Sequence, residues 1–490
     1  MIKGLILRLG KRNRELACVV ALIFIDILAF YGALSSAYLT RKLLNMFFAG
    51  LVPFDFSLGH YVRFWWILLI FISAIAYEKL YVKRLTLSDE TREMIKAVTA
   101  SVIVVFAIVS LGKLSDVISR LVIVFVWLYG LVIFPSFRLL GKKTLSALGL
   151  WREPAVIIGA GNTGMEIARG IMREPHLGYK IIGFLDDAEE KKGMEIRIDN
   201  TTYKVFGKTR HFRKFVNLLH ISTVVIAIPS LSLQKMSEIT SEVQRYTKSV
   251  LLVPDLKGIA LLNTELYHLF MQQLFLLKTN NNLKSLFNRF VKRSFDLTVA
   301  MLFFPLFFLL AGVIGILVKI DSPGPVFYSH LRIGQKGKPI RVYKIRTMYL
   351  DAREKLKEFL EKDQSAREEW GTFFKLKNDP RVTRTGKWLR GTSLDELPQI
   401  INIIKGDMSL VGPRPVLQEE IDYYYKDYAD YYFMVKPGMT GLWQTSGRNV
   451  VNYDFRVKLD TWYVLNWSLW FDIVILFKTI RVVLNKEGAY

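Results

Sequence analysis

The sequence predicts an α/β protein with membrane helices: four N-terminal transmembrane helices, a Rossmann-like α/β domain, and a C-terminal α+β domain with a re-entrant membrane helix. Three observations support this prediction. The first third of the chain holds four apolar segments of nearly membrane-spanning length. A strand, a glycine-rich loop, a helix and a second strand then follow at the spacing of a doubly wound sheet. A fifth apolar run, interrupted by Pro305, opens the basic final part.

Length and charge narrow the class of protein. A chain of 490 residues is too long for one core, and its domains are predicted at residues 1–150, 151–280 and 281–490. The formal net charge of +24 implies anionic partners such as nucleic acid, anionic lipid or phosphorylated substrates. The apolar segments favour a membrane enzyme, so no nucleic-acid partner is expected. The single cysteine, Cys18, excludes a disulfide framework and a cysteine metal site.

The four apolar segments approach the ~20 residues that a helix needs to cross a bilayer. They are Ala17–Thr40, Phe64–Leu80, Met94–Leu111 and Val117–Phe137. Basic residues cluster before the first and after the fourth, which places both ends in the cytoplasm. No cleavable signal peptide is expected, because the basic start leads into a run long enough to span. Asp26, within the first segment, is either a functional intramembrane acid or a residue paired inside the bundle.

The predicted α/β domain begins with a buried strand, Ala155–Ile158, which runs into Gly159, Gly161 and Gly164. The next strand ends at Asp186, about the ~20 residues downstream at which a dinucleotide site places its ribose-binding acid. A glycine pattern of this kind also serves tight strand–helix packing, so nucleotide binding and a purely structural role both stay open. No Tyr-x-x-x-Lys pair occurs between residues 151 and 280, so the usual acid/base pair of a short-chain oxidoreductase or sugar dehydratase is missing.

The fifth apolar run, Leu297–Val318, contains Pro305, which removes a backbone hydrogen bond and bends a helix. Crossing the membrane would put everything after it outside, away from cytoplasmic nucleotides. A re-entrant helix over residues 291–319, which turns at Pro305 and leaves on the face it entered, avoids this. Lys292 and Arg293 at one end and Lys319 at the other would then contact lipid headgroups. An ordinary fifth span is the alternative.

The chemistry is predicted at Asp395 and Glu396, which follow a run of cations that includes Arg381 and Arg390. Shortly afterwards Arg414 stands between two prolines in a Gly/Pro turn. Carboxylates ringed by cations suit phosphoryl transfer to a side-chain nucleophile, because the cations offset the repulsion between two anions.

A structural alternative stays open for the same carboxylates. Ser393-x-x-Glu396 is a capping box, in which Glu396 would only satisfy a helix N-terminus. If Pro398 opens the helix instead, both carboxylates lie just before it and are available for other work.

From Lys292 to its end the chain resembles the bacterial sugar transferases, the monotopic phosphoglycosyl transferases. The whole chain resembles the long members of this group, the undecaprenyl-phosphate galactose or glucose phosphotransferases. Four blocks in the same order carry the resemblance: Lys375–Thr383, Ser393–Gln399, Gly406–Pro415 and Gly441–Arg448. Two departures occur: Phe304 replaces the usual serine before Pro305, and Ile345 and Thr347 replace Phe and Ser. Neither touches the carboxylate pair.

The resemblance implies a reaction in two steps. Asp395 attacks the sugar-bearing phosphate of a UDP-sugar and releases UMP, and polyprenyl (undecaprenyl) phosphate then takes the phosphosugar from Asp395. Such a reaction initiates O-antigen, capsule or exopolysaccharide synthesis. Glu396 would hold Mg²⁺, and Arg414 the nucleotide. The remaining phosphate-binding or positioning residues implied are Lys375, Asp379, Arg381 and Arg448.

The expected location is the bacterial inner (cytoplasmic) membrane, as a multi-pass protein with its α/β and catalytic domains on the cytoplasmic side. Membrane lipids are expected partners, and fold analogy suggests a homodimer. Two other functions remain to be separated from this one. The first is a membrane-tethered, nucleotide-dependent, sugar-modifying oxidoreductase or dehydratase that uses Gly159–Gly164. The second is a non-catalytic scaffold for polysaccharide assembly.

Overall fold

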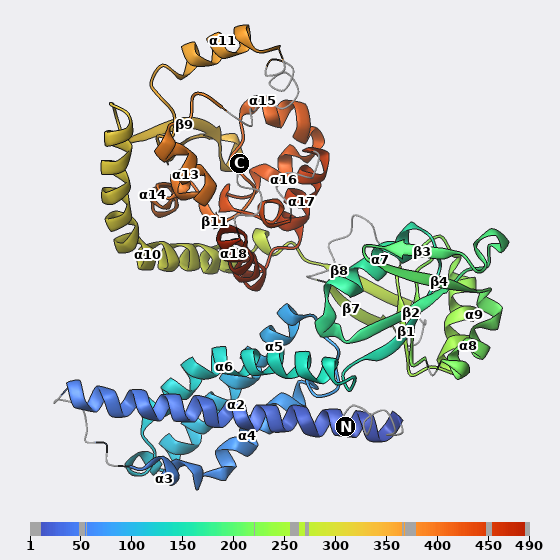
Figure 1. The fold of residues 1–490 in the computed structure, drawn as a ribbon. Helices are drawn as coiled ribbons and strands as arrows, with labels where there is room; N and C mark the ends of the chain where they lie inside the picture. Colours follow the sequence, from blue (N-terminus) through green and yellow to red (C-terminus); the bar gives the residue numbers. More distant parts are fainter. Residues whose placement is uncertain are drawn as a thin grey trace. The chain divides into compact units, whose positions relative to one another are not determined.

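The chain is seen in a computed structural model, which describes residues 11–48, 54, 56–219, 221–254, 264–269, 274–364, 367, 379–446 and 453–485. It forms two compact units, Met1–Leu256 and Lys257–Tyr490, both drawn in Figure 1. The first unit contains the N-terminal apolar helices together with a six-stranded sheet, and the second contains the carboxylate pair.

The N-terminal helices are α2 (Lys11–Phe47), α3 (Leu58–Val62), α4 (Trp65–Tyr77), α5 (Leu87–Leu111) and α6 (Arg120–Ala147). Three of them, α2, α5 and α6, are long and apolar enough to cross a membrane. The second predicted span differs: α4 has 13 residues, about 20 Å at 1.5 Å per residue, which falls short of the ~30 Å hydrocarbon core.

A buried ion-pair network lies inside this bundle. Arg138 on α6 donates to both carboxylate oxygens of Asp26, at 2.8 and 2.6 Å. Asp26 is therefore paired within the bundle, which was one of the two predicted alternatives. On the same helix, Lys142 donates to Glu90 of α5 at 2.6 Å. Glu90 also bonds His176 in the one-turn helix η2 (Pro175–Leu177), so the network links the bundle to the α/β part of the same unit.

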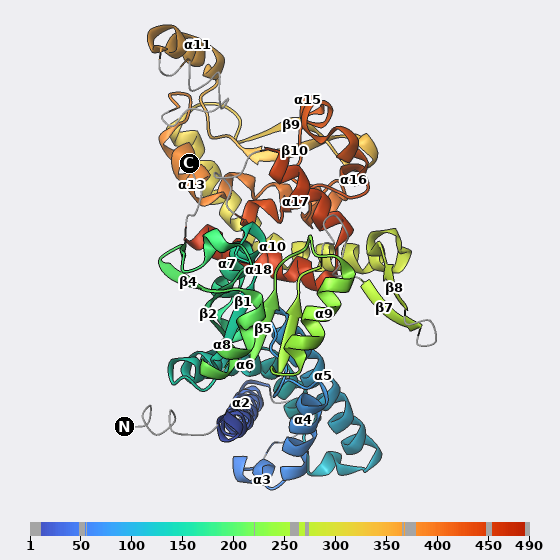
Figure 2. The same ribbon diagram turned by 90° about the vertical axis from the view of Figure 1, so that its right-hand side faces the viewer.

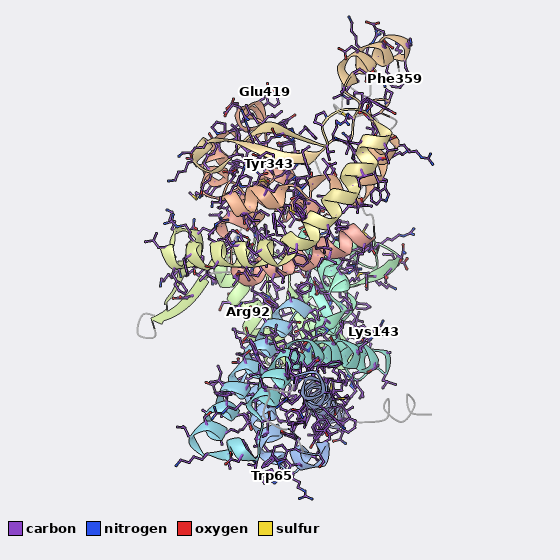
Figure 3. All side chains as sticks on the ribbon, turned by 90° about the vertical axis from the view of Figure 1, so that its left-hand side faces the viewer. Trp65, Arg92, Lys143, Tyr343, Phe359 and Glu419 are labelled. Carbon is purple, nitrogen blue, oxygen red and sulfur yellow. The ribbon has the colours of Figure 1, made fainter. Side chains whose placement is uncertain are left out.

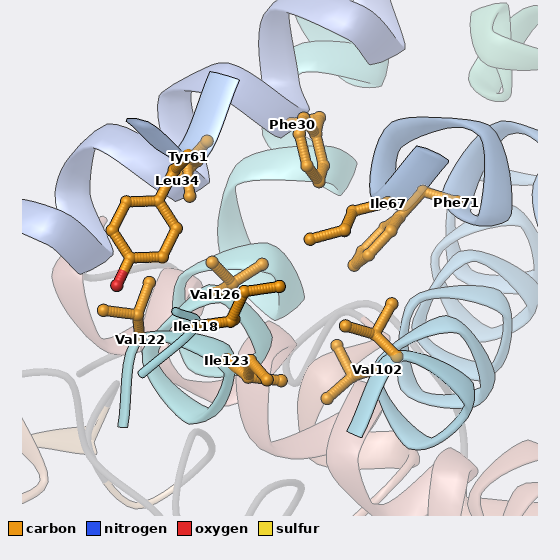
Figure 4. Close-up of a pocket in the computed structure, with 11 residues that line it drawn as sticks. Phe30, Leu34, Tyr61, Ile67, Phe71, Val102, Ile118, Val122, Ile123 and Val126 are labelled. Atoms are coloured by element: carbon orange, nitrogen blue, oxygen red, sulfur yellow. The ribbon is translucent and has the colours of Figure 1, made fainter. Parts of the chain in front are cut away.

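The bundle also encloses an apolar pocket (Figure 4). Its lining comes from α2, α3, α4, α5 and α6 and from the connection between α5 and α6, and it includes Phe30, Tyr61 and Phe71. All of the lining side chains are apolar or aromatic. Such a lining has too few hydrogen-bonding groups to bind a polar substrate, so this pocket is a poor candidate for an active site.

The α/β part of the first unit is a doubly wound sheet. Its strands are β1 (Glu153–Ile158), β2 (Tyr179–Leu185), β3 (Glu195–Ile198), β4 (Thr201–Gly207), β5 (Thr223–Ile226) and β6 (Ser249–Leu252), in the order β3-β4-β2-β1-β5-β6. In this sheet β3 and β4 pair antiparallel, and the other neighbouring strands pair parallel. Helix α7 (Asn162–Arg173) packs on one face, and α8 (Phe212–Leu218) and α9 (Leu233–Gln244) pack on the other. The predicted α/β class is confirmed, but β3, β4 and β6 were not foreseen.

The second unit combines small sheets with helices. Its strands are β7 (Thr264–Leu269), β8 (Leu274–Thr279), β9 (Phe327–Ile333), β10 (Pro339–Ile345), β11 (Ser409–Val411) and β12 (Gly438–Thr440). Its helices are α10 (Leu286–Asp321), α11 (Ala352–Lys362), α13 (Arg384–Thr392), α14 (Gln399–Lys405), α15 (Gln418–Glu420), α16 (Ala429–Phe433), α17 (Tyr453–Leu465) and α18 (Leu469–Leu484). The hairpin of β9 and β10 (Figure 2) and the parallel pair β11 and β12 flank the predicted site.

Helix α10 is continuous for 36 residues through Pro305, and Figures 1 and 3 show it as two arms joined by a bend. It is also apolar and long enough to span a membrane. Large apolar side chains are exposed on both sides of the proline, including Leu302 at 73% and Phe308 at 71%. Exposed apolar surface of this density is typical of contact with lipid.

The first arm of α10 holds the core of the second unit. Lys292 donates to Asp472 of α18 at 2.7 Å, and Arg293 donates to two carbonyl oxygens at the end of α14, at 2.6 and 3.0 Å. Asp296 accepts hydrogen bonds from the side chain of Ser409 and the amide of Leu410, both in β11. The predicted headgroup contact of Lys292 is therefore wrong, because this side chain is buried and neutralises a buried carboxylate. Arg293 is partly exposed and stabilises a helix C-terminus, and its headgroup contact stays a prediction.

Candidate active site

The carboxylate pair lies in a tight turn between two helices. Helix α13 ends at Thr392, and the next residue, Ser393, has left-handed backbone angles (φ 57°) that are uncommon outside glycine. Asp395 and Glu396 then form one 3-10 turn, and α14 begins directly after Pro398. Ser393 makes no side-chain capping bond, so the capping-box alternative is wrong. Both carboxylates precede helix α14.

Helix α13 is fixed by a close approach of its backbone to the segment after β10. A Cβ atom on Gly386 would lie 2.1 Å from the carbonyl oxygen of Thr347, so only glycine fits there. One turn later, Arg390 donates from Nε to the hydroxyl of Thr347 at 2.9 Å. The helix thereby presents a cation just before the carboxylate turn.

The two carboxylates have different electrostatic surroundings. Glu396 forms an ion pair with Lys344 of β10, with 2.6 Å between Oε1 and Nζ. Burial raises the pKa of Asp395 above its ordinary value; Lys344 and Arg390 oppose this effect, and the negative charge of Glu396 reinforces it. Asp395 is thus a poorly solvated carboxylate beside cations, which is the environment of a nucleophile rather than of a surface acid.

The β9–β10 hairpin supplies the facing wall. Lys344 pairs with Tyr328, and Val342 pairs with His330. Because side chains two residues apart share a face, Arg332 lies on the same side as His330. Burial, followed by the charges of Arg332 and Lys344, lowers the pKa of His330 to about 4, so its ring is neutral at pH 7.

These side chains line one pocket with an empty volume of about 310 Å³. Its lining residues are His330, Arg332, Val342, Lys344, Glu396, Gln399, Arg414, Pro415, Gly438, Met439 and Gln444. Three of them are cations, and one is Glu396 of the carboxylate pair. A pocket with this balance suits an anionic ligand such as a diphosphate.

Arg414 reaches the pocket from a rigid backbone crossing. The amide of Gly438 donates to the carbonyl of Pro413 at 2.7 Å. A Cβ on Gly438 would lie 2.1 Å from the amide nitrogen of Gly412, so the two segments cross with room only for glycine. The Arg414 guanidinium lies 6.0 Å from the ring centroid of Trp443. Prolines on both sides of the arginine limit its backbone further.

Asp379 and Arg381 form a bidentate pair, with donor–acceptor distances of 2.8 and 2.6 Å. Burial would raise the pKa of Asp379, but hydrogen bonds from the side chain and amide of Arg381 hold it below its ordinary value. The charge of Arg390 also acts on Asp379, as it does on Asp395. Arg390 is therefore close enough to both aspartates for its charge to stabilise their ionised forms.

Glu396 is the carboxylate of this pocket that could bind Mg²⁺. Among the residues that the structure describes, no group of three His, Cys, Asp or Glu side chains could hold a metal by itself. Magnesium shared with substrate phosphates needs only one or two carboxylates, because phosphate and water oxygens complete its shell. Glu396, at the pocket and next to Asp395, fits that second arrangement.

The structure thus brings Glu396 and Arg414 into one pocket, with Asp395 next to Glu396 in the same turn. Asp379 and Arg381 do not line this pocket, although the charge of Arg390 acts on both Asp379 and Asp395. The predicted residues Lys375 and Arg448 lie outside the described residues.

Sequence reasoning did not single out Lys344, His330 or Arg332 as site residues. The available signal was the alternation of Tyr328, His330 and Arg332 at every second position of β9. Reading that signal would have required the pairing register of the hairpin, which its loop determines.

The glycine loop of the first unit, Gly159–Gly164, is shaped mainly by close backbone packing. A Cβ on Gly159 would meet the carbonyl of Ala227 at 2.8 Å, and one on Gly164 would lie 2.0 Å from the carbonyl oxygen of Gly159. A Cβ on Gly161 would enter open space. The carboxylate of Asp186 accepts a hydrogen bond from the amide of Ala160, within the loop, at 2.8 Å. Two of the three glycines are therefore required by packing.

The chain matches two known protein families and several named relatives. Residues 287–486 match the family described as bacterial sugar transferase, and residues 65–254 match the family described as CoA-binding domain. The undecaprenyl-phosphate galactose phosphotransferase of Salmonella typhimurium is 41% identical, over 79% of this chain and 80% of that protein.

Two further relatives are similar over most of their length. The UDP-galactose-lipid carrier transferase of Erwinia amylovora is 38% identical over 82% of each chain. The UDP-glucose:undecaprenyl-phosphate glucose-1-phosphate transferase of Escherichia coli is 30% identical over 74% of each. The resemblance seen in the sequence is confirmed, and this chain belongs to the bacterial sugar transferase family.

Proposed function

We propose that this chain transfers a sugar phosphate (hexose 1-phosphate) from a UDP-sugar to polyprenyl (undecaprenyl) phosphate and releases UMP. The product would initiate O-antigen, capsule or exopolysaccharide synthesis. The observation that carries the proposal is the carboxylate pair Asp395–Glu396, with Glu396 lining a pocket together with Lys344, Arg332 and Arg414. The names of the relatives support the same donor and acceptor classes.

In the first step, a carboxylate oxygen of Asp395 attacks the phosphorus that bears the sugar. A bond forms between that oxygen and phosphorus, while the bond from phosphorus to the bridging oxygen breaks. The bridging oxygen leaves with the electron pair as part of UMP, whose phosphate is stable as an anion and needs no added proton. Burial favours this attack, because a carboxylate with few water contacts loses little solvation on reacting.

In the second step, a phosphate oxygen of polyprenyl phosphate attacks the same phosphorus. The bond to Asp395 breaks, the carboxylate is restored, and polyprenyl diphosphosugar leaves. No proton or electron is consumed over the two steps. Lys344 and Arg390, the cations that act on Asp395, would neutralise charge at phosphorus in both.

The remaining residues bind and orient the donor. Glu396 would hold Mg²⁺, which when bound neutralises charge on the diphosphate oxygens. Arg414 would bind the nucleotide. Arg381, which is oriented by Asp379, would bind a phosphate. Lys375 and Arg448 complete the proposed set.

The acceptor's long apolar tail requires a site at the membrane surface. We assign α10 as a re-entrant helix over residues 291–319, and the exposed apolar side chains on both sides of Pro305 support this. The proposed location is the inner membrane, in contact with lipid, with the catalytic and α/β domains in the cytoplasm. The proposal also includes the three-domain division, the monotopic attachment and a homodimer.

Purified full-length protein, given a panel of UDP-sugars with polyprenyl phosphate and Mg²⁺, tests the proposal by UMP release. We expect UMP from at least one donor, with sugar phosphate transferred to the lipid. No UMP from any donor would contradict the proposal. If a nicotinamide spectrum appeared without UMP, the sugar-modifying oxidoreductase would be favoured; if neither appeared, the scaffold would be.

A further inference from the structure

His330 lines the pocket beside the carboxylate pair, yet the two steps proposed above give it no role. It lies on β9 opposite Val342 and shares the pocket with Glu396, Lys344 and Arg414. A histidine at such a position would ordinarily be expected to act as an acid or base. Its surroundings point to a different use.

The hydrogen bond at one ring nitrogen fixes the tautomer. Nδ1 of His330 lies 3.4 Å from an Nη atom of Arg332. A guanidinium can only donate, so Nδ1 accepts and a neutral ring carries its proton on Nε2. The lowered pKa of His330, caused by burial and then by Arg332, Lys344 and Arg414, keeps the ring neutral.

The Nε2–H group is therefore a donor in need of an acceptor. In the part of the chain that the structure describes, Nε2 is buried and has no hydrogen-bond partner. Native proteins rarely leave a buried donor unpaired, because the lost hydration is not replaced. The acceptor that fits is a ligand atom in the pocket, and the cations Arg332, Lys344 and Arg414 favour an anionic oxygen.

We infer that His330 is a substrate-binding residue whose Nε2–H donates a hydrogen bond to a phosphoryl oxygen of the bound nucleoside diphosphate. This inference rests on the proposed function, since it places a nucleotide donor in the pocket. The neutral ring adds a directed hydrogen bond without adding a fourth positive charge to the empty pocket. The three cations supply attraction, and His330 supplies orientation.

Binding measured by calorimetry on the full-length protein in detergent, with Mg²⁺, tests the inference without any need for turnover. The two probes are UDP and inorganic pyrophosphate, which share the phosphates but not the base. His330→Met removes the donor and keeps the volume, whereas His330→Gln keeps an N–H at similar reach. His211→Gln, at an exposed histidine of the first unit, is the matched control.

We expect His330→Met to weaken both probes by about 10- to 100-fold, as for a lost hydrogen bond to a charged group. His330→Gln and His211→Gln should stay within about threefold of wild type. Unchanged binding in His330→Met, equal losses in His330→Met and His330→Gln, or a loss for UDP alone would each overturn the inference. So would a wild-type protein that binds neither probe.

A second measurement covers the case in which His330→Met does not fold. In wild-type protein with ¹⁵N-labelled histidine, pyrophosphate should shift the Nε2 resonance of His330, and an unmoved resonance would overturn the inference. UMP release is measured on the same wild-type sample. If that protein bound both probes but released no UMP, the proposed function would fail and the binding inference would remain.

Discussion

Two turns of this molecule each place an aspartate next to the start of a helix, and they use it in opposite ways. Asp186 accepts hydrogen bonds from the amides of Ala160 and Ala188 and from Lys191. Burial alone would raise its pKa, but these bonds outweigh burial and hold the pKa low. At Asp395 burial prevails, and the pKa is raised although Lys344 and Arg390 act against it. A satisfied carboxylate stabilises a loop, whereas a desolvated one beside cations is ready to react.

The largest expected effect separates these two aspartates directly. Asp395→Asn should reduce UMP release by at least about 1,000-fold, because it removes the nucleophile. Asp186→Asn should leave UMP release per folded molecule within a few-fold of wild type. The control for a change of charge is Asp422→Asn, at an exposed acid of the same unit. Equal activity in wild type and Asp395→Asn would contradict the assigned roles.

The next prediction concerns Glu396, the proposed Mg²⁺ ligand beside Asp395. Glu396→Gln should raise the Mg²⁺ concentration for half-maximal UMP release by about 10- to 100-fold, because an amide binds this ion less well than a carboxylate. Lys338→Met, at an exposed lysine of the β9–β10 loop, serves as the control and should leave the metal dependence unchanged. A Glu396→Gln enzyme with lower maximal rate but wild-type metal dependence would exclude Glu396 as the metal ligand.

The glycine loop offers a test of stability. Gly164→Ala would place a Cβ 2.0 Å from the carbonyl oxygen of Gly159, whereas Gly161→Ala would extend into open space. We expect the first to destabilise the protein by about 2–4 kcal/mol and the second by less than about 1 kcal/mol. Thermal unfolding in detergent measures both. Similar melting temperatures for the two variants would show that the loop is not held by this close contact.

The smallest expected effect concerns pH. Asp395 must be deprotonated to attack. We therefore expect kcat/KM to be highest above the pKa of Asp395 and to fall as the pH drops through that pKa. Because the pKa of Asp395 is raised, the fall should begin at a higher pH than the ordinary aspartate value of about 3.9 would give. Removing the like charge in Glu396→Gln should move the fall to lower pH. A pH profile unchanged by that substitution would show that the charge of Glu396 does not raise the pKa of Asp395.

Much of this arrangement could be predicted from local sequence. The carboxylates, the proline-flanked Arg414 and the strand–loop–helix of the α/β domain all occur within short stretches. The partners of Lys292 and Arg293 could not be predicted, because they lie 180 and 110 residues away. Both charges were therefore expected to contact headgroups, which is the usual fate of cations beside an apolar helix.

Pairing between strands set a similar limit. Lys344 and His330 belong to the pocket only because the β9–β10 register places them on one face. A shift of one residue would place Lys344 and His330 on opposite faces of the hairpin. The strained backbone of Ser393 was also hidden, because the capping pattern at the same residues predicted a regular helix start.

The most direct test of the central claim is mass spectrometry of the protein after exposure to donor alone, with Mg²⁺ and no lipid acceptor. We predict that the peptide containing Asp395 gains the mass of one hexose phosphate, that UMP is released in a matching amount, and that polyprenyl phosphate removes the added mass. UMP formation with Asp395 unmodified at every time sampled, or the added mass on a different residue, would contradict the account.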